Sequence, residues 1–130
     1  MKNIKLSTVI IDDEVAPILG LIDLLNVFSS IDIVGTATNL DDGIALIKVT
    51  QPDIVFVDIN MPGRSGLEIY NEFELNHFKI ILCTSNQQFT SDERRNVASG
   101  YLLKPVNIKI LHTILQKVYD EFILERKLQK

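Results

Sequence analysis

The feature that most constrains the fold is a series of five apolar runs at regular spacing. They begin near Ser7, Ile31, Asp53, Phe78 and Tyr101, at intervals of 24, 22, 25 and 23 residues. Each interval has room for one helix and two short loops. Parallel strands need crossovers of that length, and strands buried on both faces carry consecutive apolar residues. The spacing therefore predicts an α/β chain of the (βα)5 type, with a five-stranded parallel sheet and helices on both faces.

Apolar residues at helical spacing predict where the crossover helices lie. The second helix should begin at a cap on Asn39 and end at Gln51-Pro52. The first helix should bury the stripe Val15, Ile18, Leu19, Ile22 and Leu25. Two more are expected at about residues 66–75 and, with a thin apolar stripe, within residues 88–98. The last helix should start after Asn107 and bury Ile108, Leu111, Ile114, Leu115, Val118 and Phe122.

Size and composition narrow the class of protein. We expect one domain over residues 1–130, with a polar tail from about residue 125 to residue 130. A net charge of -4 argues against direct nucleic-acid binding, which needs a basic surface. No apolar stretch approaches the ~20 residues of a membrane span, and the N-terminus does not read as a signal peptide. The single Cys83 can form no internal disulfide. A cytoplasmic protein that does not enter a membrane is expected.

Polar side chains follow four of the five apolar runs. Asp12 and Asp13 follow the first run, Asp58 the third, Thr84 the fourth and Lys104 the fifth. If the runs are parallel strands, all of these groups emerge at one edge of the sheet. Adjacent carboxylates repel one another unless a cation lies among them, and oxygen ligands suit Mg²⁺ or Mn²⁺. The pattern predicts a site for a divalent cation and a phosphoryl group.

Each of these residues also has a plain structural interpretation when it is taken alone. Asp13 could cap the first helix, Asp58 could cap a turn before Pro62, Thr84 could end a strand and Lys104 could be a solvated charge. Independent loop residues have no reason to recur at successive strand ends, so the joint pattern favours a site. Cys83, His77 and His112 are assigned no role.

With these residues in place, the chain resembles the receiver domains of bacterial two-component response regulators over essentially its whole length. The resemblance rests on Asp12-Asp13, Asp58 with Met61-Pro62-Gly63 and Ser65-Gly66, Thr84, and Tyr101 with Lys104-Pro105. It implies a doubly wound, flavodoxin-like sheet in the order 2-1-3-4-5. The run from Asp58 to Gly63 is also similar to receivers fused to LytTR-type DNA-binding domains. The chain departs from the family pattern at Ser85, where alanine is usual, and at Val97, where glycine is usual.

The resemblance implies a role for each matching residue. Asp58 would accept a phosphoryl group from a histidine kinase or phosphotransfer protein, with Lys104 and Thr84 assisting. Mg²⁺, or Mn²⁺ in its place, would be held by Asp13, Asp58 and the backbone carbonyl of Asn60, with Asp12 acting through a water. Thr84 and Tyr101 would form the switch. A cis peptide bond is implied between Lys104 and Pro105.

The same resemblance implies a signalling protein rather than an enzyme, with self-catalysed phosphotransfer and autodephosphorylation only. Its partners would be a downstream effector or a fused output domain, and a homodimer would form through the fourth helix, fifth strand and fifth helix. The alternative is a degenerate receiver that acts only as an interaction module. A haloacid-dehalogenase-type phosphatase would need a second aspartate where Asn60 stands. A flavodoxin-like carrier would need a phosphate loop where Asp12-Asp13-Glu14 would repel phosphate.

Overall fold

The computed structural model describes residues 4–74, 77–85 and 98–128. Its centre is a parallel sheet of five strands in the order β2-β1-β3-β4-β5, which confirms the predicted topology. The strands are β1 (Leu6–Ile11), β2 (Ile31–Ala37), β3 (Ile54–Asp58), β4 (Lys79–Thr84) and β5 (Gly100–Leu103). The strand order reverses between β1 and β3, where ligands of such sheets bind.

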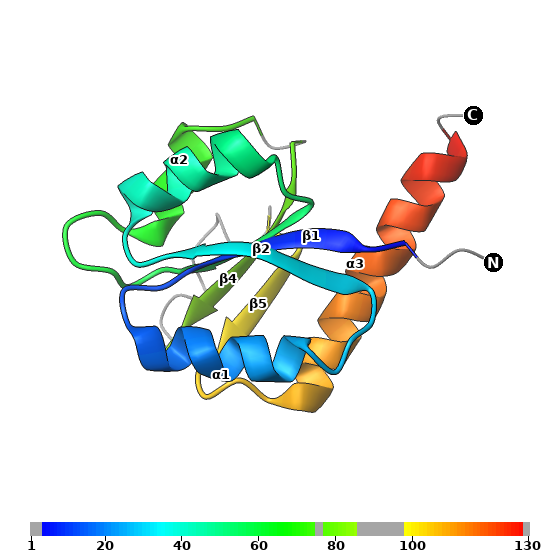
Figure 1. Cartoon of the computed structure of the whole chain (residues 1–130), viewed down its shortest axis with the longest axis horizontal. Helices are drawn as coiled ribbons and strands as arrows, with labels where there is room; N and C mark the ends of the chain where they lie inside the picture. The colour runs from blue at the N-terminus through cyan, green and yellow to red at the C-terminus, as the bar shows by residue number, and fades with distance from the viewer. Residues whose placement is uncertain (1–3, 75–76, 86–97, 129–130) are drawn as a thin grey trace.

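Helices cover both faces of the sheet (Figure 1). The helix α1 (Val15–Leu25) and the long C-terminal helix α3 (Ile108–Leu128) pack on one face. The helix α2 (Leu40–Thr50) and the short 3₁₀ helix η1 (Gly66–Asn71) pack on the other. Because successive residues of a strand point to opposite faces, β3 supplies Phe56 to the first core and Val55 and Val57 to the second. All five residues of β3 are buried, as expected for a central strand.

Local signals fix the ends of α2 and the start of α3. The Asn39 side chain accepts a hydrogen bond from the backbone N–H of Asp42, and so caps α2 as predicted. The helix ends at Thr50 and is capped by Gln51, which has a left-handed backbone with φ of 47° and directly precedes Pro52. Asn107 likewise accepts from the N–H groups of Lys109 and Ile110 at the start of α3. The two asparagines therefore fix where α2 and α3 begin.

The predicted buried face of α1 was partly wrong. Ile18 and Leu25 are buried, but Val15 and Leu19 are 59% and 57% exposed, and Leu21 is buried instead. An 11-residue helix this rich in apolar residues contains two overlapping stripes, and only the packing against the sheet selects one of them. Ile108 was also predicted to be buried, but it lies in the first turn of α3 and is 40% exposed.

The segment expected to form a helix over residues 66–75 forms only the six-residue η1. Gly66, Ile69, Tyr70 and Asn71 all have modest helix propensity, which favours a short 3₁₀ helix over a longer α-helix. Its start is fixed by a capping box between Ser65 and Glu68. The helix expected within residues 88–98 falls almost wholly outside the described residues.

Candidate functional site

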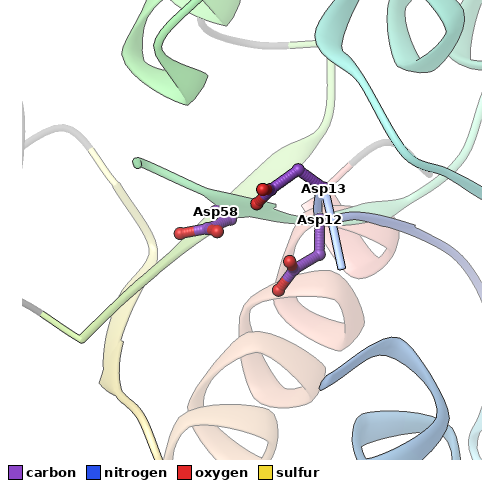
Figure 2. A group of neighbouring side chains, drawn as sticks. All are labelled: Asp12, Asp13 and Asp58. Atoms are coloured by element: carbon purple, nitrogen blue, oxygen red, sulfur yellow. The ribbon is translucent and has the colours of Figure 1, made fainter. Parts of the chain in front are cut away.

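The ends of β1 and β3 bring three carboxylates together at the carboxyl edge of the sheet (Figure 2). Ile11 of β1 pairs with Val57 of β3, so Asp12 and Asp58 follow at neighbouring positions. One carboxylate oxygen from each of Asp12, Asp13 and Asp58 lies within 4.8 Å of the others. Asp12 and Asp58 are each only 5% exposed. The ends of two adjacent strands therefore place three carboxylates close together, and two of the three side chains are buried.

Lys104 brings a positive charge to this cluster from the end of β5. Its Nζ lies 2.5 Å from Asp12 Oδ2 and 3.2 Å from Asp58 Oδ2. The backbone N–H of Lys104 donates to the Thr84 carbonyl, which ties the turn after β5 to the end of β4. The Lys104–Pro105 peptide bond is cis, as predicted. A single ammonium thus bridges two of the three carboxylates.

Burial and the neighbouring charges together raise the pKa values of Asp58, Lys104 and Cys83. Burial raises the pKa of Asp58, as does the charge of Asp12, although Lys104 and the Asn60 backbone N–H act against the rise. Burial alone would lower the pKa of Lys104, but its hydrogen bond to Asp12 and the charge of Asp58 outweigh burial and raise it. Lys104 therefore stays an ammonium at neutral pH. Burial raises the pKa of Cys83 to about 12, so its thiol is uncharged at neutral pH.

The donor set fits a hard divalent cation. Three carboxylates face one ammonium, so an ionised cluster keeps a net negative charge at a place that is mostly closed to water. Among the described residues, no hydrogen bond or ion pair occupies the Asp13 carboxylate. Carboxylate and backbone carbonyl oxygens are the ligands that Mg²⁺ and Mn²⁺ favour. The residues present can hold such an ion.

Asp12 and Asp13 differ in their surroundings. Asp12 accepts from the Glu14 backbone N–H at 3.0 Å and from Lys104, so both of its oxygens have protein partners. The residue that caps α1 is Glu14, without a side-chain cap, and the interpretation of Asp13 as a helix cap is wrong. Asp13 is half-buried and points toward Asp58 (Figure 2).

Asn60 makes a contact that the sequence did not reveal. Its backbone N–H donates to Asp58 Oδ1 at 3.2 Å, and its side-chain amide donates to the buried Thr84 hydroxyl at 2.8 Å. The only signal for this contact was the predicted pairing of β3 with β4, which puts the residues after Asp58 beside Thr84.

Tyr101 is the second residue of β5. It pairs with Leu82 and packs against the core under α2 and η1. Leu82 also pairs with Val57, the residue before Asp58, so Tyr101 lies one residue short of the sheet edge that carries the carboxylates.

The loop after Asp58 is pressed against that residue. A Cβ atom on Gly66 would overlap the Asp58 carbonyl oxygen, so only glycine fits this position. Gly63 has φ of 84°, a conformation that side chains rarely adopt. The two glycines let the chain turn back and pack beside the strand end that carries Asp58.

A cavity of about 640 Å³ opens beside the cluster, between α1, the sheet and the residues after β5. Its walls are mainly apolar, with Leu21 and Leu24 from α1, Phe56 from the sheet and Val106 from the loop. Asp12, Asp58 and Lys104 also line it. The carboxylate of Asp58 is thus reachable from a partly enclosed, mostly apolar space.

Comparison with known proteins agrees with this geometry. The family described as the response regulator receiver domain matches residues 8–116. The transcriptional regulatory protein BtsR of Escherichia coli K12 is 32% identical over 117 residues, covering 89% of this chain and 49% of that protein. An uncharacterized response regulatory protein of Vibrio cholerae is 32% identical over 114 residues, covering 87% of this chain and 48% of its own length.

A solved DNA-binding response regulator of the LuxR family from Staphylococcus aureus has a TM-score of 0.76 and 28% identity to this chain. The match covers 88% of this chain and 98% of that one. The chain therefore belongs to the receiver domain family of bacterial two-component response regulators. It spans about half the length of the curated relatives that it matches. Across the part of the chain that the structure describes, no helix has both the length and the apolar character needed to cross a membrane.

Proposed function

We propose that Asp58 is the phosphoacceptor of a two-component signalling system. The observation that carries this proposal is the position of its carboxylate, which lies 3.2 Å from the Lys104 ammonium and within one cluster with Asp12 and Asp13. A carboxylate nucleophile needs nearby positive charge, because the transferred phosphoryl group brings more negative charge to a site that is already anionic. Lys104 supplies that charge from a fixed strand end.

The proposed metal ligands are Asp13, Asp58 and the Asn60 backbone carbonyl, with Asp12 acting through a water. Asp13 suits direct binding because its carboxylate has no protein partner among the described residues, while both Asp12 oxygens are engaged. A bound Mg²⁺ would neutralise charge on the phosphoryl oxygens in the transition state. Mn²⁺ has the same ligand preference and could replace it.

In the transfer step, a carboxylate oxygen of Asp58 attacks the phosphorus of a phosphohistidine on a kinase or phosphotransfer protein. A P–O bond forms, the P–N bond breaks, and its electron pair stays on the imidazole nitrogen. Lys104 then pairs with a phosphoryl oxygen instead of the Asp58 oxygen that it now contacts. The Thr84 hydroxyl leaves Asn60 and donates to another phosphoryl oxygen. These movements transmit the local charge change toward Tyr101 on the next strand.

The output of the switch is proposed to be a partner protein or a fused effector domain, acting in the cytoplasm. The relatives support an output domain, because this chain covers only about half of their length and one of them is a transcriptional regulatory protein. The receiver itself is proposed to occupy residues 1–130 and to carry out only its own phosphorylation and dephosphorylation. Homodimerisation would use β5, α3 and the segment between β4 and β5.

Beryllofluoride tests this proposal, because it mimics a phosphoryl group on an aspartate. In the presence of Mg²⁺, we expect a bound fluoride signal in ¹⁹F NMR of the wild-type protein and none in Asp58→Ala. The Asp53→Ala variant is the matched control, since Asp53 lies before the opposite end of β3 and its partly buried carboxylate accepts from the backbone N–H and the hydroxyl of Ser7. A wild-type spectrum without the bound signal would favour a receiver that works only as an interaction module.

A further inference from the structure

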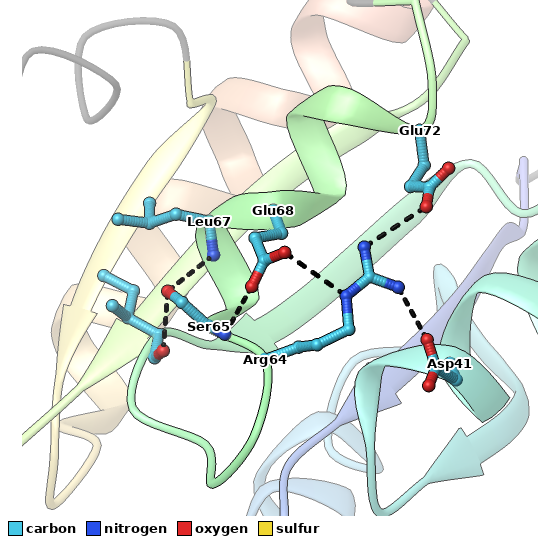
Figure 3. Close-up of polar contacts among 7 residues, drawn as sticks. Asp41, Arg64, Ser65, Leu67, Glu68 and Glu72 are labelled. Carbon is cyan, nitrogen blue, oxygen red and sulfur yellow. Dashed lines mark hydrogen bonds and ion pairs between the residues drawn. The ribbon is translucent and has the colours of Figure 1, made fainter.

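Arg64 lies in the loop between β3 and η1 and contacts three carboxylates at once (Figure 3). Its guanidinium lies 2.6 Å from Asp41, 3.2 Å from Glu72 and 3.3 Å from Glu68. Asp41 belongs to the first turn of α2, whereas Glu68 and Glu72 belong to η1 and its end. Hydrogen bonds to Asp41 and Glu72 raise the pKa of Arg64 further above its usual range. Arg64 thus links the loop to two separate elements.

The residues after Arg64 connect this network to the site. Glu68 uses its other oxygen to accept from the Ser65 backbone N–H, as Figure 3 shows. The Ser65 hydroxyl and the Gly66 N–H both donate to the Ile59 carbonyl, at 3.1 and 3.0 Å. Ile59 directly precedes Asn60, whose N–H bonds to Asp58. Hydrogen bonds, joined by short stretches of backbone, therefore connect Arg64 to the residues beside Asp58.

We propose that Arg64 is a positioning residue for the metal site. It holds the loop of residues 59–65 against α2 and η1, and so fixes the Asn60 carbonyl where the ion needs an oxygen ligand. This inference rests on the proposed function, because it assumes that Asn60 and the aspartates bind a divalent cation. Arg64 acts from outside the cluster, since its guanidinium is bound to carboxylates of α2 and of η1 and its end.

The direction of the change in Mg²⁺ affinity shows whether Arg64 acts by positioning the loop or only through its charge. Removing a positive charge near a cation site makes the local potential more negative, so Coulomb attraction alone would make Arg64→Met bind Mg²⁺ more tightly. Positioning predicts the reverse, because a loosened loop must be ordered again when the ion binds. Single exposed ion pairs contribute little, but groups that orient metal ligands can change affinity considerably. We expect Arg64→Met to weaken Mg²⁺ binding by about fivefold.

The test measures the Mg²⁺ dissociation constant by isothermal titration calorimetry, with circular dichroism to verify that each variant is folded. Arg64→Lys retains the charge but cannot reproduce the planar contacts to three carboxylates, so it should also weaken binding, though less than Arg64→Met. The matched control is Lys79→Met, which removes the same charge from an ion pair 2.8 Å long at the opposite end of β4. The Mg²⁺ affinity of Lys79→Met should equal that of the wild-type protein or be slightly higher.

Amide NMR spectra add a second readout that does not depend on activity. Without Mg²⁺, Arg64→Met should shift the resonances of Ile59 and Asn60, while Lys79→Met should not. Tighter or unchanged Mg²⁺ binding in both Arg64 variants would overturn the positioning role. If the wild-type protein showed no Mg²⁺ binding that Asp58→Asn weakens, the proposed function itself would fail, and the two failures are therefore distinct.

Discussion

The side-chain amide of Asn60 donates a 2.8 Å hydrogen bond to the hydroxyl of Thr84, across the ends of β3 and β4. Thr84 is fully buried, so its hydroxyl is closed to bulk water. In the proposed switch the Thr84 side chain moves toward Asp58, so its hydroxyl gives up the hydrogen bond that it accepts from Asn60 and donates to a phosphoryl oxygen. The Asn60–Thr84 hydrogen bond therefore stabilises the unphosphorylated arrangement.

Asn60→Ala should shift the switch toward its activated form. The variant keeps the backbone carbonyl at position 60 but loses the hydrogen bond to Thr84, which contributes roughly 1 kcal/mol. We expect beryllofluoride to induce the Tyr101 chemical-shift change at about one fifth of the wild-type concentration. The measurement is an NMR titration at constant Mg²⁺, with Asn26→Ala, at the exposed end of α1, as the control. A higher concentration requirement in Asn60→Ala would contradict the proposed restraint.

Mg²⁺ affinity should depend more on Asp13 than on Asp12. Asp13→Asn removes charge from a carboxylate that is available to the ion, whereas Asp12 is already bonded to Lys104 and Glu14. Loss of a direct ligand should lower affinity by at least about tenfold, and loss of Asp12 by less. Calorimetric titration of both variants checks this order. Equal losses would mean that the two aspartates share the ion in the same way.

Asp58→Asn should stabilise the metal-free domain at neutral pH. Burial raises the pKa of Asp58, so the folded protein holds that proton more tightly than the unfolded chain does. The resulting stabilisation is present below the ordinary aspartate pKa of 3.8 and is lost as the pH rises through the higher folded-state value. Urea unfolding should show the Asp58→Asn variant to be more stable than wild-type at pH 7, with little difference near pH 4. Asp23→Asn on the exposed side of α1 is the control, and no gain at pH 7 would refute the argument.

Gly66→Ala should be strongly destabilising. The added methyl group would overlap the Asp58 carbonyl oxygen, so the backbone beside the site must move, at an expected loss of about 3 kcal/mol in the free energy of unfolding. Gly20→Ala is the matched control, because nothing lies within 4 Å of a Cβ there and alanine favours a helix. It should raise stability by about 0.5–1 kcal/mol. Similar unfolding midpoints for the two variants would contradict this prediction, because they would show that the loop accommodates the added methyl group at little cost.

The backbone arrangement of the site was predictable because it follows from strand register. Once the runs ending at Asp58, Thr84 and Lys104 are parallel strands, their last residues must share one edge. The side-chain contacts were not predictable in the same way. Arg64 and Asn60 have several partners within reach, and the choice of Asp41 or Thr84 depends on how loops and α2 pack. The exposed Leu19 shows the same limit, since helical spacing alone did not identify the buried face of α1.

The central claim is that Asp58 accepts a phosphoryl group, and intact-mass spectrometry tests it most directly. The protein is incubated with Mg²⁺ and a small phosphodonor such as acetyl phosphate, then compared with Asp58→Asn under the same conditions. The account predicts that the wild-type mass rises by one phosphoryl group, that hydroxylamine removes it, and that Asp58→Asn shows no increase. Equal phosphorylation of Asp58→Asn, or none in the wild-type protein, would contradict the account.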